Sequence, residues 1–193
     1  MPETRKERPF ADWKVLSEEQ LISLPPWLSV WAEEVELPDG RCVHPFYRID
    51  QPDYVIIFPL TVSGRVVGIW HYKHGPGEET LGLPAGYVMS GEVPEDAARR
   101  ELLEETGYAA KHWQSLGRYC VDGNRGCGWA HVFFAKGLST KAQPQPDDLE
   151  EWELEEMPLQ IIEEHLNKGR VRTLGAAAAI SLGLRFLNTS YGA

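Results

Sequence analysis

The stretch that decides the fold runs from Gly86-Tyr-Val-Met-Ser-Gly-Glu92 to Arg100-Glu-Leu-Leu-Glu-Glu-Thr-Gly107-Tyr108. Its first part is rich in small residues, which is typical of a loop. Residues 92–106 then predict a helix, because Pro94 fits a first helical turn and Gly107 fits a helix C-cap. A loop that leads directly into an acidic helix is therefore the central element of the chain.

The predicted helix gathers carboxylates on one face. At about 100° per residue, Glu101 and Glu105 lie about 40° apart, and Glu104 lies about 60° to the other side of Glu101. No lysine occurs between Glu92 and Thr106 to relieve their repulsion. Hard oxygen ligands of this kind suit Mg²⁺ or Mn²⁺. A solvated acidic face is the alternative for carboxylates that stand alone.

The flanking sequence predicts an α+β fold. Alternating apolar residues and turn signals indicate strands at 54–58, 65–70, 80–83, 113–121, 128–136 and 152–157. Two further helices are expected at 159–167 and 173–187. Strands outnumber helices and do not alternate regularly with them, which favours a sandwich over a doubly wound sheet.

Charge and composition limit the possible partners. The formal charge of −10 argues against a broad surface for nucleic acid or for a membrane, since both need clustered cations. The expected partner is a small molecule. The three cysteines, Cys42, Cys120 and Cys127, have no spacing typical of a disulfide framework or a zinc site. No apolar run approaches the roughly 18 residues of a membrane span, so we expect a cytoplasmic protein.

Residues 86–108 match the Nudix box, Gly-x5-Glu-x7-Arg-Glu-U-x-Glu-Glu-x-Gly-U, where U is bulky and apolar. All nine defined positions within these 23 residues agree. The chain therefore resembles the Nudix hydrolase superfamily. The resemblance implies a Nudix-type α/β/α sandwich with a mixed β-sheet.

The resemblance also implies a divalent metal site and a role for each residue of the box. The implied metal ligands are the carbonyl of Ala85 and the carboxylates of Glu101, Glu104 and Glu105, with Glu104 ligating directly or through water. Arg100 is expected to orient the site by pairing with Glu104 or Glu92. Gly86 would permit a tight turn of the loop.

The implied reaction is attack of water on one phosphorus of a diphosphate, which needs a general base. Relatives often take the base from a late acidic loop. Here the candidates are Asp148, Glu150 and Glu151, with Glu150 favoured by spacing. The competing mechanism uses a metal ligand of the helix, such as Glu104, as the base.

The wider chain resembles the branch of the superfamily that hydrolyses ADP-ribose and nucleotide sugars. Leu83-Pro-Ala-Gly86 before the box and a β-rich N-terminal part carry this likeness. We expect an N-terminal extension at 1–50, a Nudix domain at 51–190 and a homodimer. The substrate is expected to be a nucleoside diphosphate derivative, most of all ADP-ribose or another nucleotide sugar. Alternatives are another dinucleotide, a non-nucleotide diphosphate, or a nucleotide-sensing module without catalysis.

Three residues are candidates for substrate binding. Trp31 is one of several N-terminal aromatic residues that could hold a nucleobase, although core packing is the favoured alternative for each, including Trp27 and Tyr47. Lys73 stands near the place where relatives use an arginine toward substrate. Arg125 lies in a glycine-rich turn, which fits either a phosphate-binding loop or a plain hairpin turn.

Overall fold

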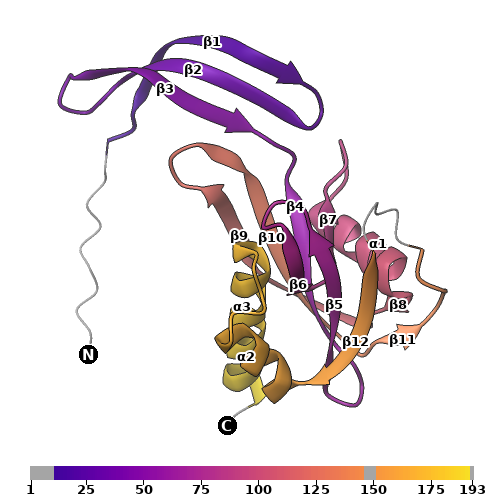
Figure 1. Cartoon of the computed structure of the whole chain (residues 1–193). Helices are drawn as coiled ribbons and strands as arrows, with labels where there is room; N and C mark the ends of the chain where they lie inside the picture. Colours follow the sequence, from indigo (N-terminus) through magenta and orange to yellow (C-terminus); the bar gives the residue numbers. More distant parts are fainter. Residues whose placement is uncertain (1–10, 146–150, 192–193) are drawn as a thin grey trace, which may run out of the picture. The chain divides into compact units, whose positions relative to one another are not determined.

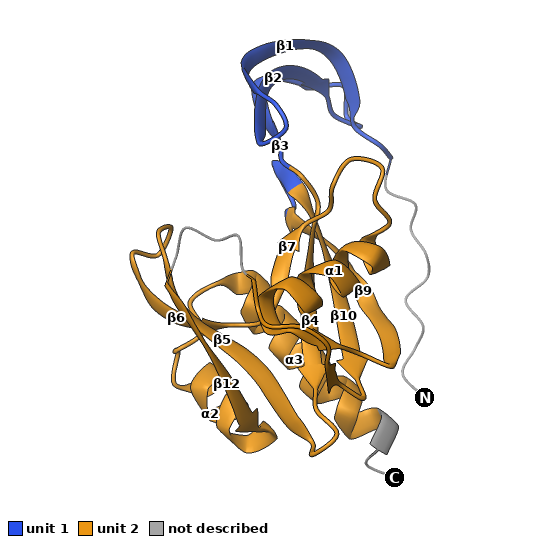
Figure 2. Ribbon diagram, turned by 90° about the vertical axis from the view of Figure 1, so that its right-hand side faces the viewer, with its two compact units in different colours: residues 1–51, 122–127 blue, residues 52–121, 128–193 orange. Residues whose placement is uncertain are grey.

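The computed structural model describes residues 11–145 and 151–191. The chain divides into two compact units (Figure 2). Unit 1 comprises residues 1–51 and 122–127, and unit 2 comprises residues 52–121 and 128–193. The box lies in unit 2.

Unit 1 is built on a three-stranded antiparallel sheet. Its strands are β1 (Lys14–Leu24), β2 (Leu28–Glu36) and β3 (Cys42–Asp50) (Figure 1). Gly40 adopts φ +84° in the turn between β2 and β3, a conformation that glycine allows without strain. The sequence pattern did not indicate β1, because this strand is exposed along its whole length and shows no apolar alternation.

Unit 2 is built on a mixed sheet, as expected. Its larger strands are β4 (Tyr54–Leu60), β5 (Arg65–Lys73), β9 (His112–Asp122), β10 (Gly126–Lys136) and β12 (Trp152–Pro158). The shorter strands of this sheet are β6 (Glu78–Gly82) and β7 (Ala85–Tyr87), whereas β8 (Tyr108–Ala109) and β11 (Ser139–Thr140) pair with each other in a separate two-stranded sheet. β10 pairs with β4 in parallel, whereas β12 and β6 both pair with β5 antiparallel. β7 pairs with β4, which brings the start of the box to the centre of this sheet.

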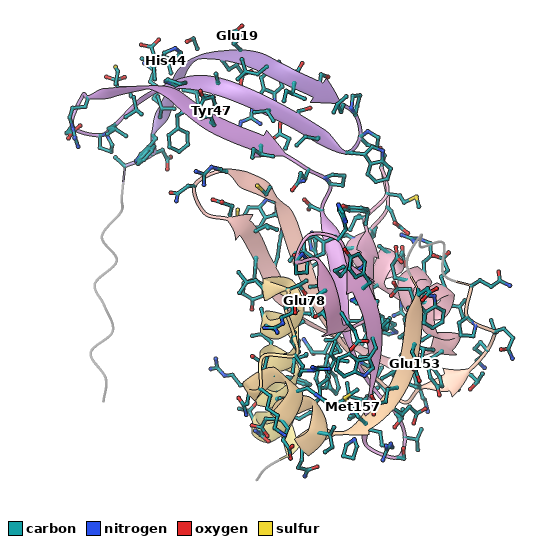
Figure 3. The ribbon with its side chains drawn as sticks, in the orientation of Figure 1. Glu19, His44, Tyr47, Glu78, Glu153 and Met157 are labelled. Atoms are coloured by element: carbon teal, nitrogen blue, oxygen red, sulfur yellow. The ribbon has the colours of Figure 1, made fainter. Side chains whose placement is uncertain are left out.

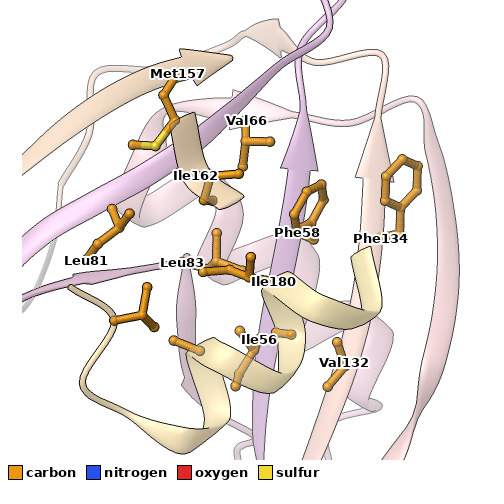
Figure 4. Close-up of a cluster of buried hydrophobic side chains, with 13 residues drawn as sticks. Ile56, Phe58, Val66, Leu81, Leu83, Val132, Phe134, Met157, Ile162 and Ile180 are labelled. Carbon is orange, nitrogen blue, oxygen red and sulfur yellow. The ribbon is translucent and has the colours of Figure 1, made fainter. Parts of the chain in front are cut away.

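Helices cover both faces of the unit 2 sheet. They are α1 (Pro94–Thr106), α2 (Leu159–Asn167) and α3 (Leu174–Tyr191). Along β4, Val55 and Ile57 pack in one core with α1, whereas Ile56 and Phe58 pack in a second core with α2 and α3 (Figure 4). Two covered faces explain why four successive β4 residues are apolar and buried. The expected α/β/α sandwich is confirmed.

Local signals define the ends of α1. Pro94 occupies the first turn, where a missing N–H costs no hydrogen bond. Glu95 and Asp96 follow, and their charges favour a helix N-terminus. Gly107 closes the helix at φ +71°, with its N–H donated to the carbonyl of Leu103. The helix is thus fixed at both ends with its acidic residues in between.

Candidate functional site

Arg100 is the hub of the box. Its guanidinium donates to the Glu92 carboxylate, with both N···O distances 3.0 Å, and to the carbonyl of Tyr87 at 3.0 Å. It also donates to Glu101 at 2.6 Å and to Glu104 at 3.1 Å. Arg100 therefore makes both of the contacts considered from sequence, to Glu92 and to Glu104, and ties the loop to the helix.

Glu92 closes the loop from the other side. Its carboxylate also accepts the N–H of Met89 at 2.9 Å. The hydrogen bonds from Arg100 lower the pKa of Glu92 below its ordinary value, and the Met89 bond acts in the same direction. The carboxylate is thus ionised and saturated with donors, which fits a structural part better than a reacting one.

Glu101 lies directly over Gly86. A Cβ on Gly86 would stand 2.1 Å from the carboxyl carbon of Glu101, closer than any real contact. Burial raises the pKa of Glu101 above its ordinary value, and the hydrogen bond from Arg100 opposes that shift. The expected tight turn at Gly86 is wrong, since Gly86 lies in the strand β7 and pairs with Val55 of β4. Glycine is required there because the Glu101 carboxylate approaches the β7 backbone.

Glu105 is joined to the residue before the glycine. Its carboxylate accepts the N–H of Ala85 at 2.8 Å. The last turn of α1 and the strand β7 are therefore linked next to the Ala85 carbonyl. Glu104 is more exposed, and it contacts Arg100.

The donor set fits a divalent metal ion. Glu101 and Glu105 lie against Gly86 and Ala85 of β7, and all the donors are hard oxygens of the type that Mg²⁺ or Mn²⁺ binds. Within residues 11–145 and 151–191, no group of three or more His, Cys, Asp or Glu side chains is already gathered as for a metal ion. Arg100 instead neutralises part of the acidic charge.

A small cavity adjoins these residues. It has a volume of about 150 Å³ and is lined by Ala85 and Glu105 on one side and by Lys73 on another. Lys73 is the last residue of β5, which places its side chain beside the box. The structure thus brings this expected substrate residue together with two expected metal ligands.

Comparisons with known proteins assign the fold and the box. Residues 50–174 match the family described as NUDIX domain. The chain belongs to the NUDIX family. Residues 13–49 match a second family, described as the nucleoside diphosphate sugar hydrolase N-terminal domain. A solved structure described as an ADP compounds hydrolase has a TM-score of 0.82 at 20% identity, over 97% of this chain and 100% of that chain.

Named relatives of this NUDIX protein include two hydrolases. An ADP-ribose pyrophosphatase of Bacillus subtilis is 29% identical over 139 residues, 72% of this chain and 74% of the relative. A CMP-5'-(N-acetyl-N-hydroxy-3-aminopropyl)phosphonate hydrolase of Streptomyces rubellomurinus is 29% identical over 163 residues, 84% of this chain and 78% of the relative.

The other expected site residues of the NUDIX chain belong to unit 1 or lie in or beside a segment that the structure does not describe. Trp31 and Arg125 belong to unit 1. The Trp31 indole N–H donates to Asp50 at 2.8 Å, and Arg125 pairs with Asp122 at 3.4 Å in the hairpin turn between β9 and β10. Asp148 and Glu150 fall outside the described residues, and Glu151 is exposed.

The expectation of core packing is wrong for two aromatic residues. Trp27 is 60% exposed and Tyr47 is 49% exposed. Tyr47 projects from the unit 1 sheet, as Figure 3 shows. No helix among the described residues is long and apolar enough to cross a membrane.

Sequence reasoning missed two residues of the site region, Tyr54 and His71, which line the cavity with Lys73. Burial raises the pKa of the Tyr54 phenol, so it remains a hydrogen-bond donor at neutral pH. Only the alternation of His71 and Lys73 along a strand gave a signal, because residues two apart share a face. The position of Tyr54 beside this cavity depends on the pairing of β4 with β10 and β7, which are distant in the sequence.

Proposed function

We propose that this NUDIX protein uses Mg²⁺ or Mn²⁺ to hydrolyse the diphosphate of a nucleotide sugar such as ADP-ribose. The products would be a nucleoside monophosphate and a sugar phosphate. Its family and its named relatives identify it as a hydrolase that acts on pyrophosphate bonds. The observation that carries the proposal is the placement of Glu101 against Gly86 and of Glu105 against Ala85, beside a cavity that Ala85, Glu105 and Lys73 line.

The metal would be held by Glu101, Glu105, the Ala85 carbonyl and Glu104, the last directly or through water. When bound, it would supply neutralisation of the phosphate oxygens and a lower pKa for a bound water. The hydrogen bonds from Arg100 to Glu101 and Glu104 would orient these carboxylates. Arg100 would orient these carboxylates because its own guanidinium is held in place by hydrogen bonds to Glu92.

The reaction consumes one water and gives two products, each of which carries one phosphate group. The water oxygen forms a bond to one phosphorus, and the bond from that phosphorus to the bridging oxygen breaks. The bridging oxygen leaves on the other phosphate. A base accepts the proton of the water, and Glu150 is our candidate, with Glu104 as the alternative. Lys73 would neutralise a phosphate oxygen next to the cavity.

Unit 1 is proposed to supply dimer contacts and a nucleobase site. It exposes large apolar side chains, namely Trp13, Val15, Leu16, Leu21, Ile22, Leu24, Trp27 and Tyr47. Exposed apolar surface of this extent is typical of an interface. Trp31 would contribute to base binding and Arg125 to binding of a phosphate or sugar. The match to a nucleoside diphosphate sugar hydrolase N-terminal domain supports a substrate-related role for this unit.

The test is product analysis on a panel of compounds. Purified protein is incubated with ADP-ribose, other nucleoside diphosphate sugars, NADH and dinucleoside polyphosphates, with Mg²⁺, Mn²⁺ or excess chelator. We expect metal-dependent formation of a monophosphate and a sugar phosphate from at least one nucleotide sugar. Absence of turnover for the whole panel in either metal would refute the proposal.

A cytidine compound belongs in the same panel. The Streptomyces relative is named for hydrolysis of a CMP phosphonate, at the same 29% identity as the ADP-ribose pyrophosphatase. A preference for cytidine compounds would retain the chemistry and change the base. Tight nucleotide binding without turnover in any divalent metal would instead favour a sensing module.

A further inference from the structure

The cavity beside the box is walled by polar groups from several elements. Tyr54 comes from β4, His71 and Lys73 from β5, and Thr173 from the segment just before α3. Glu105 of α1 lines the same space. All of these residues belong to unit 2, so the cavity is complete within one compact unit.

His71 occupies a fixed place in this wall. In β5 it pairs with Thr80 of β6 and with Trp152 of β12, so its backbone lies between two neighbouring strands. Its ring lies across Gly82, where a Cβ would stand 2.8 Å from Nε2. The absence of a side chain at Gly82 therefore makes room for the imidazole at the cavity.

Two other residues that line the cavity, Lys73 and Tyr54, are positioned by the strands β5 and β4. Lys73 follows His71 by two residues, so both side chains project from the same face of β5. Gly175 leaves room for the Tyr54 ring, because a Cβ at Gly175 would stand 2.9 Å from the phenol oxygen. An imidazole, an ammonium group and a phenol thus face the space that Glu105 borders. These groups can hydrogen-bond the hydroxyl and phosphate oxygens of a ligand. The remaining wall, which includes Ile56, Leu83 and Ala176, is apolar and can pack against the carbon skeleton of a sugar ring.

The size of the cavity restricts what enters. Its volume of about 150 Å³ is half or less of the roughly 300–1,000 Å³ typical of pockets that enclose a drug-sized ligand. This volume suits a group smaller than a whole nucleoside. A single sugar ring attached to a phosphate at Glu105 fits the volume and the hydrogen-bonding groups better.

We propose that this cavity binds the sugar on the non-nucleoside side of the diphosphate, and that His71 determines specificity for that sugar. The inference rests on the proposed function, because it assigns a subsite of the same active centre. His71 would hydrogen-bond a sugar hydroxyl while Lys73 holds the adjoining phosphate. Replacement of the imidazole by an apolar group leaves a sugar hydroxyl without its partner, which selectively penalises sugar substrates.

The experiment compares two substrates that share one nucleoside diphosphate, a nucleotide sugar and the methyl ester of the same nucleoside diphosphate. The ratio of their kcat/KM values is measured for the wild type, His71→Leu and His71→Gln, all with Mg²⁺. We expect His71→Leu to lower the ratio by about tenfold or more, since one hydrogen bond to the substrate is lost. His71→Gln keeps a donor and should retain most of the ratio.

His74→Leu is the matched control, because His74 is exposed, lies three residues further along the chain and does not line the cavity. It should leave the ratio unchanged. An unchanged ratio in His71→Leu, or an equal fall in His74→Leu, would overturn the inference. If His71→Leu does not fold, the same comparison is made with His71→Ala, which also removes the hydrogen-bonding group.

A binding measurement separates this inference from the proposed function. Ribose 5-phosphate is titrated calorimetrically into the Mg²⁺-loaded wild type and His71→Leu. Turnover of neither substrate by the wild type would defeat the proposed function, yet binding that weakens tenfold in His71→Leu would still support a sugar phosphate site. Equal affinity of the wild type and His71→Leu for ribose 5-phosphate, or no binding by the wild type, would overturn the inference of a sugar site at His71.

Discussion

Arg100 carries more of the site than any other single side chain. One guanidinium contacts three carboxylates and the loop carbonyl of Tyr87. Since the side chain is only 25% exposed, these charged bonds are weakly screened by solvent. The loop and the helix are therefore coupled through one residue.

Arg100→Met should unfold more easily and lose activity. We expect a loss of about 1–3 kcal/mol in the free energy of unfolding, because charged bonds are broken and carboxylates are left crowded. Urea denaturation followed by circular dichroism measures this loss. Arg99→Met is the control on the same helix. Its pair with Glu95 is about half exposed, so its loss should stay below about 1 kcal/mol. Equal losses of unfolding free energy in Arg100→Met and Arg99→Met would contradict a special role of Arg100 in joining the loop to the helix.

Glu92 makes the stability of the loop dependent on pH. Its pKa is lowered in the folded protein, so its stabilising effect is present above the unfolded value near about 4.3 and is lost as the pH falls through the folded value. Glu92→Gln should therefore be less stable than the wild type at pH 7, and the difference should shrink below about pH 4. Urea titrations at several pH values check this, and a constant difference would contradict it.

At the scale of elements, two glycines allow a helix to approach a strand. Gly86 leaves room for Glu101 of α1, and Gly183 of α3 leaves room for the ring of Phe58, from which an added Cβ would stand 2.3 Å. At each glycine the backbone approaches a side chain of the packed element, and the two contacts lie on opposite faces of the unit 2 sheet. Their substitution tests the packing of each layer separately.

Gly86→Ala should reduce turnover by about a hundredfold or more, because the added methyl group displaces an expected metal ligand. Gly75→Ala is the control, since a Cβ there meets nothing within 4 Å. Steady-state kinetics with saturating Mg²⁺ compares the two variants. Normal turnover in Gly86→Ala would show that the Glu101 carboxylate need not lie over the loop.

Gly183→Ala tests whether an alanine in α3 raises or lowers the stability of the protein. Helix propensity alone would stabilise the protein by about 1 kcal/mol. The clash with Phe58 should dominate and destabilise it by about 1–3 kcal/mol. Thermal unfolding decides between the two, and a rise in Tm would contradict the packing described for α3.

The sequence predicted those elements best whose ends carry a local signal. The helix expected at 92–106 is observed as Pro94–Thr106, because proline and glycine mark its ends, and α2 is observed at its expected limits. β1 was not predicted, since it is exposed throughout and lacks alternation. The box revealed the acidic residues, but the contacts of Arg100, the cavity and His71 depend on strands that pair across long sequence distances.

At the scale of the whole molecule, unit 1 carries large apolar side chains that are exposed in the described part of the chain. Leu21, Leu24 and Trp27 are each about half exposed or more. We expect light scattering to give about twice the chain mass of 21.8 kDa. Leu21→Glu combined with Leu24→Glu should shift the protein toward the monomer, and Val62→Glu, in the 84% exposed position outside unit 1, should not. A monomeric wild type would contradict the dimer.

The central claim is that the carboxylates of the box form a metal-dependent centre for diphosphate hydrolysis. Its most direct test is the release of phosphate from a panel of nucleoside diphosphate derivatives through a coupled phosphatase, for the wild type and Glu105→Gln with Mg²⁺ or Mn²⁺. Metal-dependent release by the wild type that disappears in a folded Glu105→Gln variant is the expected result. Release that persists in Glu105→Gln, or that ignores the metal, would contradict the account.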